Sequence, residues 1–129
     1  MGDLSTNFSM DEFACRDGCG LGTEQEHYDV YGWPQMIDDL ETIRSSLGVP
    51  IFIESGLRCE AHNRSEGGVD NSAHMRCAVD VRLGYFRGPN KYHLVKCAFE
   101  LGFTGIGLAK TFAHLDRDTV KARPAIWIY

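Results

Sequence analysis

The spacing of apolar residues along the chain predicts two long helices. Over residues 33–47 the apolar side chains recur at the three- and four-residue intervals of one helix face, Pro34 stands in the first turn, and Gly48 follows the last. A second helix is predicted over residues 90–101, with Gly102 as its C-terminal signal. Its inner face is assigned to Tyr92, Val95, Ala98 and Phe99.

Two shorter helical segments and one turn-rich segment are also predicted. In "FSMDEF", Ser9 and Glu12 have the spacing of a capping box, while Phe8 and Phe13 can pack the short helix onto the core. A brief helical turn is expected over residues 60–65. The segment "CRDGCGLGTEQEHYDVYG" contains four glycines and no sustained period, which is typical of turns.

Alternating and β-branched segments predict the strands. "VPIFIES", residues 49–55, has the composition of a buried strand. In "CAVDVR", residues 77–82, Val79 and Val81 share one face, so Asp80 points the other way, towards water or a site. Three short strands are expected at "GIGLA", "FAHLD" and "AIWIY". Because strands and helices do not alternate regularly, we predict an α+β fold with a small, mainly antiparallel sheet packed against helices.

Length, charge and hydropathy narrow the class of protein. A chain of 129 residues suits a single domain, which we take to span residues 1–129. The formal charge of -5 argues against nucleic acid as a partner, because proteins that track phosphates concentrate Lys and Arg on one face. No apolar run approaches the length of a membrane span, and the N-terminus lacks the features of a secretory signal. We therefore expect a monomer made in the cytoplasm, without stable membrane insertion.

The five cysteines are an odd number, so they cannot all be paired in disulfides within the chain. We expect most of them to be reduced and partly buried. Cys15 and Cys19 could form half of a zinc site, but no second pair follows at the spacing of a zinc finger. A tight, glycine-containing turn is the expected structure there.

Two segments carry candidate chemistry: "NSAHMRCAVDV" at residues 71–81 and "FAHLD" at residues 112–116. A catalytic zinc site commonly has three protein ligands with nitrogen or oxygen donors and an open position for water. His74, Asp80 and His114 would supply such a set. With five histidines and eighteen acidic residues in the chain, however, spacing alone also allows a chance pairing.

The order of several motifs resembles that of the M15 zinc peptidases. These motifs are "SGLRCEAHN", "GGVDNSAHMRCAVDV", "GFTGIG" and "FAHLD", and "FSMDEFACRDGCG" is similar to the opening of single-domain members. The family contains D-Ala-D-Ala carboxypeptidases and dipeptidases and phage L-alanyl-D-glutamate endopeptidases, and its fold is related to the hedgehog signalling domain. The resemblance therefore implies a hedgehog/DD-peptidase-like fold.

The resemblance also implies roles for individual residues. His74, Asp80 and His114 match the zinc ligands of the family motif. Arg58 would bind substrate and stabilise the charge that develops during attack on the peptide bond. Ser72 would donate a hydrogen bond to the substrate.

The chain departs from the family motif between two of these ligands. The interval from His74 to Asp80 is one residue shorter than in the family, and Cys77 stands where a glycine is expected. A one-residue loss inside a strand would turn every later side chain to the wrong face. The loss must therefore be absorbed in the turn around Arg76 and Cys77 if Asp80 is to remain a ligand. A thiol role for Cys77, as a soft ligand or a nucleophile, ranks behind the zinc set.

The general base is the second departure. Several members use a glutamate three places before the last histidine, where this chain has Thr111, and others have a histidine where it has Phe112. Asp116 is the nearest carboxylate on the same strand face as His114, so it is the candidate catalytic group. Its alternative role is to accept a hydrogen bond that holds His114 in the right tautomer.

Taken with the resemblance, these residues imply a zinc-dependent peptidase that acts on the D-amino-acid-containing stem peptides of bacterial peptidoglycan. A phage-type endolysin, acting in the periplasm or cell wall after release, or from the virion, is the first expectation. One alternative is a D-Ala-D-Ala carboxypeptidase of cell-wall metabolism. The other is a non-catalytic zinc-binding module of the same fold, which Thr111 favours.

Overall fold

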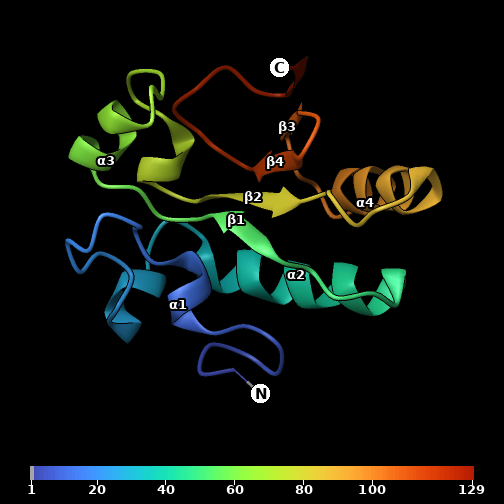
Figure 1. The fold of residues 1–129 in the computed structure, drawn as a ribbon, viewed down its shortest axis with the longest axis horizontal. Coiled ribbons are helices and arrows are strands. Elements are labelled where there is room, and N and C mark those ends of the chain that lie inside the picture. Colours follow the sequence, from blue (N-terminus) through green and yellow to red (C-terminus); the bar gives the residue numbers. More distant parts are fainter. Residues whose placement is uncertain (1) are drawn as a thin grey trace.

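Five strands form one sheet in the order β1-β2-β4-β3-β5 (Figure 1). The computed structural model describes residues 2–129. The strands are β1 (Ile53–Ser55), β2 (Ala78–Arg82), β3 (Gly105–Leu108), β4 (Phe112–Asp116) and β5 (Ala125–Ile128). Neighbouring strands are antiparallel except for β3 and β5, which are parallel. The predicted α+β class with a mainly antiparallel sheet is confirmed.

Within residues 2–129, four helices and two 3-10 turns surround the sheet (Figure 1). They are α1 (Met10–Phe13), α2 (Trp33–Leu47), α3 (Glu60–Ser65) and α4 (Gly88–Glu100), with the 3-10 turns η1 (Gln25–Tyr28) and η2 (Ala73–Met75). Helices α1 and α2 lie along the side of the sheet next to β1, α3 lies near the start of β2, and α4 lies beyond its end. In the described part of the chain, no helix has the length and apolar character needed to cross a membrane.

Helix α2 has the limits that the sequence predicts, and its ends show why. Gly32 and Gly48 flank it in the left-handed conformation, which glycine adopts without the steric cost that a Cβ brings. The N–H of Gly48 donates to the carbonyl of Arg44 at 3.0 Å, and so satisfies one carbonyl of the last turn. Pro34 lies in the first turn, where its missing N–H costs nothing.

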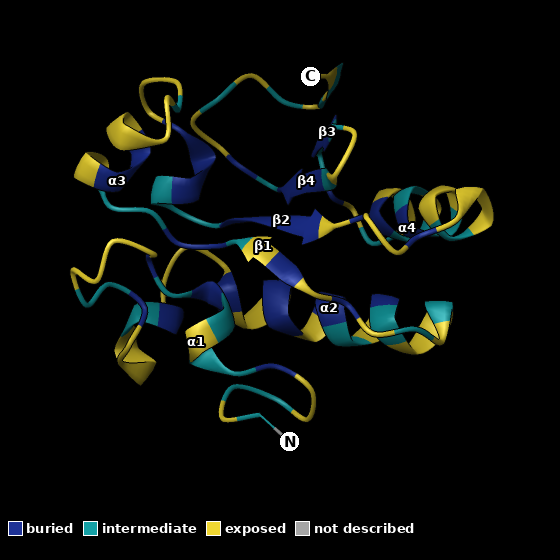
Figure 2. Cartoon of the chain, in the orientation of Figure 1, coloured by how far each residue is buried: buried dark blue, intermediate teal, exposed yellow. Residues whose placement is uncertain are grey.

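The core lies between α2 and the sheet, as the band of buried residues in Figure 2 shows. An aromatic cluster anchors the N-terminal segment to α2: the ring centroids of Phe13 and Trp33 are 5.7 Å apart, and those of Phe8 and Phe13 are 5.8 Å apart. Val79 and Val81 of β2 are fully buried in the same core. Because side chains alternate along a strand, burial of these two valines points Asp80 to the opposite face.

Two details of the predicted elements are wrong. The strand predicted over 49–55 is only three residues long and lies at the edge of the sheet, where Phe52 is 47% exposed. In α4 the buried residues are Leu94 and Ala98, whereas Tyr92 and Phe99 are 73% and 77% exposed. Apolar residues occur on several sides of α4, so periodicity alone does not identify the face that packs on the protein.

Candidate metal centre

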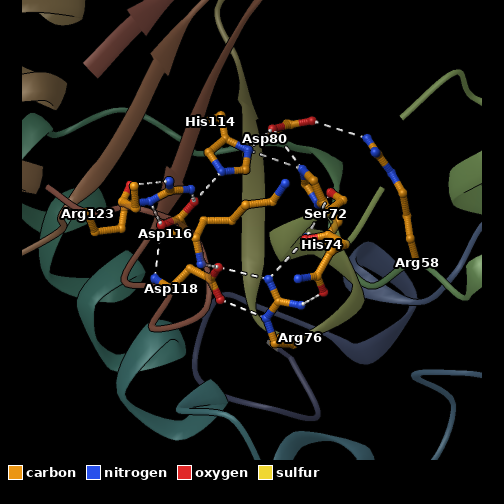
Figure 3. Close-up of polar contacts among 12 residues, drawn as sticks. Arg58, Ser72, His74, Arg76, Asp80, His114, Asp116, Asp118 and Arg123 are labelled. Carbon is orange, nitrogen blue, oxygen red and sulfur yellow. Dashed lines mark hydrogen bonds and ion pairs between the residues drawn. The ribbon is translucent and has the colours of Figure 1, made fainter. Parts of the chain in front are cut away.

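Three side chains from three different elements meet at the sheet. His74 comes from η2, Asp80 from β2 and His114 from β4, and Asp80 and His114 are directly paired across the two strands (Figure 3). His74 Nε2 lies 3.2 Å from Asp80 Oδ1 and 3.2 Å from His114 Nδ1, and the third distance, from His114 Nδ1 to Asp80 Oδ1, is 3.1 Å. All three residues are buried.

Hydrogen bonds on the far side of each ring determine which nitrogen can bind a metal. The carbonyl of Gly56 can only accept, so His74 Nδ1 carries a proton and donates to it at 2.8 Å. His114 Nε2 donates to Asp116 Oδ2 at 2.6 Å. The nitrogens that face Asp80 are therefore left with lone pairs when the rings are neutral. Three electron-pair donors then converge without a hydrogen between them, an arrangement that a cation stabilises.

The size of this triangle fits a zinc ion. Zinc bonds to nitrogen and oxygen of about 2.0–2.1 Å imply tetrahedral edges of roughly 3.3 Å, close to the three distances found here. A cavity of 470 Å³ adjoins the cluster, and all three candidate ligands line it. Substrate and water can therefore reach the side of the cluster that has no protein ligand, as a catalytic zinc site requires.

The pKa values of these groups reflect their shared environment. Burial raises the pKa of Asp80, but without a metal ion the protonated rings of His114 and His74 donate hydrogen bonds to Asp80, and these outweigh the effect of burial and hold its pKa well below the usual range. Burial lowers the pKa of His114, but its hydrogen bonds to Asp116 and Asp80 more than compensate and raise it. Asp80 is therefore an anion at neutral pH, and protons compete with a metal ion for this site.

Asp116 lies behind His114, on the side away from Asp80 (Figure 3). It is fully buried and accepts hydrogen bonds from Arg123 Nε and Nη2 at 2.8 and 2.7 Å, and from the N–H of Asp118 at 2.9 Å. Burial raises its pKa, but Arg123 and His114 lower it well below the usual range. A buried carboxylate with all these partners is suited to orienting His114, and less suited to exchanging protons with a substrate.

Arg58 and Ser72 both line the cavity. Arg58 Nη2 lies 3.7 Å from Asp80 Oδ2, and its Nη1 donates to Asn63 Oδ1 at 3.3 Å. Among residues 2–129, its buried Nε has no hydrogen-bond partner. The hydroxyl of Ser72 accepts from the N–H of His74 at 3.3 Å, so Ser72 also helps to hold η2 in place.

An irregular turn separates His74 from β2, the strand that carries Asp80. Arg76 follows η2 with φ -121° and ψ -85°, outside both helix and strand. Its carbonyl accepts from Trp33 Nε1 at 2.9 Å, and its guanidinium binds both oxygens of Asp118 at 2.7 and 2.8 Å. These contacts hold the turn, so β2 starts in the register that brings Asp80 to the cluster. Cys77 packs against the core, and burial raises the pKa of its thiol to about 12, which disfavours a nucleophilic thiolate.

Sequence reasoning missed the C-terminal wall of the cavity. Trp127 of β5 packs on His114 with ring centroids 5.2 Å apart, and the Arg123 guanidinium lies 5.1 Å from the Trp127 ring. Gly105 and Gly107 of β3 make room for this wall: a Cβ at Gly105 would collide with Asp116 and Arg123, and one at Gly107 with Trp127. Glycines at alternate positions in a strand were the available signal, because they mark close approach by other groups.

Together, the fold and the cluster define an α+β domain with a candidate mononuclear metal centre beside an open cavity. The family model of peptidase M15 matches residues 6–116, which include all three candidate ligands. The chain therefore belongs to the peptidase M15 family, and the resemblance seen in its motifs is confirmed. A search of curated proteins found no match.

Proposed function

We propose that this M15 peptidase is a zinc-dependent hydrolase of peptidoglycan stem peptides, and that it acts as a monomer. His74, Asp80 and His114 hold the zinc ion. The observation that carries the proposal is the convergence of three buried lone pairs at 3.1–3.2 Å beside a cavity. A bound zinc ion supplies Lewis acidity, which polarises a peptide carbonyl and makes water a better nucleophile.

Arg58 is the group of the chain that stabilises negative charge on the substrate. Its guanidinium lines the cavity beside Asp80, and its Nε has no hydrogen-bond partner in the described structure. A donor already fixed in place binds an oxyanion without the cost of reorganising solvent. Ser72 lies in the same wall and offers its hydroxyl hydrogen to the substrate.

The composition of the cavity wall suits a peptide that carries carboxylates. Arg58, Lys121 and Arg123 supply three cations to the wall, whereas Asp80 and Glu66 supply two acids. Peptidoglycan stem peptides carry free carboxylates, so cationic walls favour their binding. Phe112, Trp127 and Tyr129 complete the wall with aromatic surface that excludes water from a bound peptide.

We propose that Asp116 is a positioning residue that orients His114, and that another group transfers the proton. Of the two carboxylates in the cavity wall, Asp80 is a ligand, so Glu66 is the candidate for exchanging a proton with the substrate. The Glu66 side chain is 57% exposed, and its Oε1 lies 3.8 Å from His62 Nε2. This exposure leaves the Glu66 carboxylate open to contact with a substrate in the cavity, as a group that exchanges a proton with the substrate must be.

The preferred activity within this proposal is that of a phage-type endolysin, which cuts within the stem peptide in the periplasm or cell wall, or from the virion. One observation favours the D-Ala-D-Ala carboxypeptidase alternative: the free Nε of Arg58 could pair with a terminal carboxylate. Another favours a non-catalytic module: Thr111, at the position of the family's general base, is an exposed residue without an acid group.

Digestion of purified peptidoglycan by the zinc-loaded protein, followed by mass spectrometry of the fragments, tests the proposal. New N-termini at D-Glu indicate the endopeptidase, and loss of terminal D-Ala alone indicates the carboxypeptidase. A zinc-loaded protein that releases nothing would contradict the proposal and favour the binding module. His114→Ala should abolish both zinc binding and cleavage, while His93→Ala, which changes a histidine on α4 outside the cavity, should leave both unchanged.

A further inference from the structure

A second cluster of metal-ligating side chains lies outside the cavity. Cys15, Asp17 and Cys19 come from the turn after α1, and Cys59 comes from the segment just before α3. One ligand atom from each of these four residues lies within 4.8 Å of the others. The N-terminal turn and the α3 segment therefore bring together three thiols and a carboxylate that are separated by forty residues in the sequence.

The distances within this cluster suit a thiophilic ion. Cys15 Sγ and Cys59 Sγ are 3.8 Å apart, and tetrahedral zinc with Zn–S bonds of about 2.3 Å has S–S edges of roughly 3.8 Å. The two oxygens of Asp17 lie 3.2 Å from Cys15 Sγ and 3.0 Å from Cys59 Sγ. With two thiolates at these positions, the Asp17 carboxylate and the two sulfurs would repel one another, and a bound cation would offset that repulsion.

Backbone N–H groups already donate hydrogen bonds to three of the four candidate ligands. The N–H of Cys59 donates to Cys15 Sγ, and the N–H of His62 donates to Cys59 Sγ, both at 3.4 Å. The N–H of Cys19 donates to Asp17 Oδ1 at 3.0 Å. Such hydrogen bonds orient metal ligands and stabilise their negative charge. The turn also depends on Gly18 and Gly20, with φ of 77° and 92° in the left-handed region.

We propose that Cys15, Asp17, Cys19 and Cys59 form a second, structural site for a thiophilic divalent cation such as zinc. Three thiolates and one carboxylate complete a four-coordinate set, and a closed set is typical of structural rather than catalytic zinc. The ion would tie the N-terminal turn to the segment that carries Arg58, the residue next to Cys59. It would thereby hold in place the guanidinium of Arg58, whose Nη2 lies 3.7 Å from Asp80 Oδ2 at the cavity wall.

Metal analysis of the full-length protein, purified without chelator, tests this site separately from the catalytic one. We expect about two zinc ions per chain, and about one in either Cys59→Ser or His114→Ala, because each variant removes a ligand from a different site. Cys97→Ser, which changes a cysteine on α4 outside the cluster, is the matched control and should retain both ions. Loss of an ion in Cys59→Ser alone does not depend on the proposed peptidase activity.

Cobalt substitution supplies a direct signature of the ligands. With Co²⁺ in place of zinc, thiolate-to-metal charge-transfer absorption should appear in the wild type, persist in His114→Ala, and disappear in Cys59→Ser. Cys19→Ser changes an exposed residue and should weaken the absorption band. This second variant tests the site even if Cys59→Ser fails to fold. One zinc ion per chain with all thiols free would refute the site. A protein mass two hydrogens lower than that of the reduced chain, mapped to a disulfide between Cys15 and Cys59, would also refute the site.

Discussion

Asp116→Asn separates an orienting role for Asp116 from a catalytic one. The two oxygens of Asp116 accept four hydrogen bonds: Oδ1 from Arg123 Nε and the N–H of Asp118, and Oδ2 from Arg123 Nη2 and His114 Nε2. An asparagine has the same shape, but its NH₂ group cannot accept from any of these donors. Whichever way the amide points, two of the donors lose their acceptor.

The less costly orientation places the NH₂ group towards His114. In that orientation His114 can move its proton from Nε2 to Nδ1 and accept from the new amide, which leaves only Arg123 Nη2 in need of another partner. In the other orientation, Arg123 Nε and the backbone N–H of Asp118 both lose their acceptor. A proton on His114 Nδ1, however, blocks the atom that faces His74 and Asp80.

The expected loss follows from the role of such hydrogen bonds in metal sites. Removing the acceptor of a metal-bound histidine commonly costs 10–100-fold in affinity, or about 1.4–2.7 kcal/mol, so we expect a rise of about that size in the zinc Kd. The metal-free protein should also lose about 3 kcal/mol of unfolding free energy, because Arg123 loses its ion pair with the fully buried carboxylate of Asp116.

Competition with a chromophoric chelator measures the zinc Kd, and urea unfolding in EDTA measures the stability of the metal-free chain. Asp39→Asn is the matched control, because Asp39 is also buried and paired with an arginine, Arg117, but lies outside the cavity. It should lose stability and keep its zinc affinity. If Asp116→Asn bound zinc as tightly as the wild type but lost all cleavage, the orienting role would be wrong and a catalytic role supported.

Three further predictions concern the cavity and its supports. Arg58→Lys should lower kcat/KM for stem peptides by about 10–100-fold, as expected for the loss of one fixed donor to developing charge, with zinc content unchanged; unaltered kinetics would contradict its role. Glu66→Gln should lower kcat by about 100-fold or more with zinc content unchanged, and an unaltered kcat would assign the proton transfer to another group. The hydrogen bonds from Arg76 lower the pKa of Asp118, although burial opposes this shift. The stability that this pair contributes is therefore fully present above the unfolded pKa of about 3.9. It is lost as the pH falls through the lower pKa of the folded state. Asp118→Asn should therefore cost about 2 kcal/mol in urea unfolding at pH 7, with a smaller difference below about pH 4; an equal cost at both pH values would show that the charge is not responsible.

Local patterns were sufficient where short-range physics decides the structure. The limits of α2 follow from Pro34, the apolar face and Gly48, all of which act within a few residues of one another. The face of Asp80 follows from the alternation of β2 in the same way. The ligand set itself came from the resemblance to M15 peptidases, because spacing alone did not distinguish it from chance.

The remaining features depend on contacts between distant segments. Cys59 lies forty residues after Cys19, and the two meet only because α1 packs against β1 and the α3 segment follows it. Similarly, Trp127 reaches His114 and Arg123 reaches Asp116 because β5 pairs in parallel with β3, a pairing that no local period encodes. The sequence by itself determined the main elements and the motifs that place this chain among the M15 peptidases. The tertiary structure decided which side chains surround them, because loop closure and strand pairing act over separations at which periodicity carries no information.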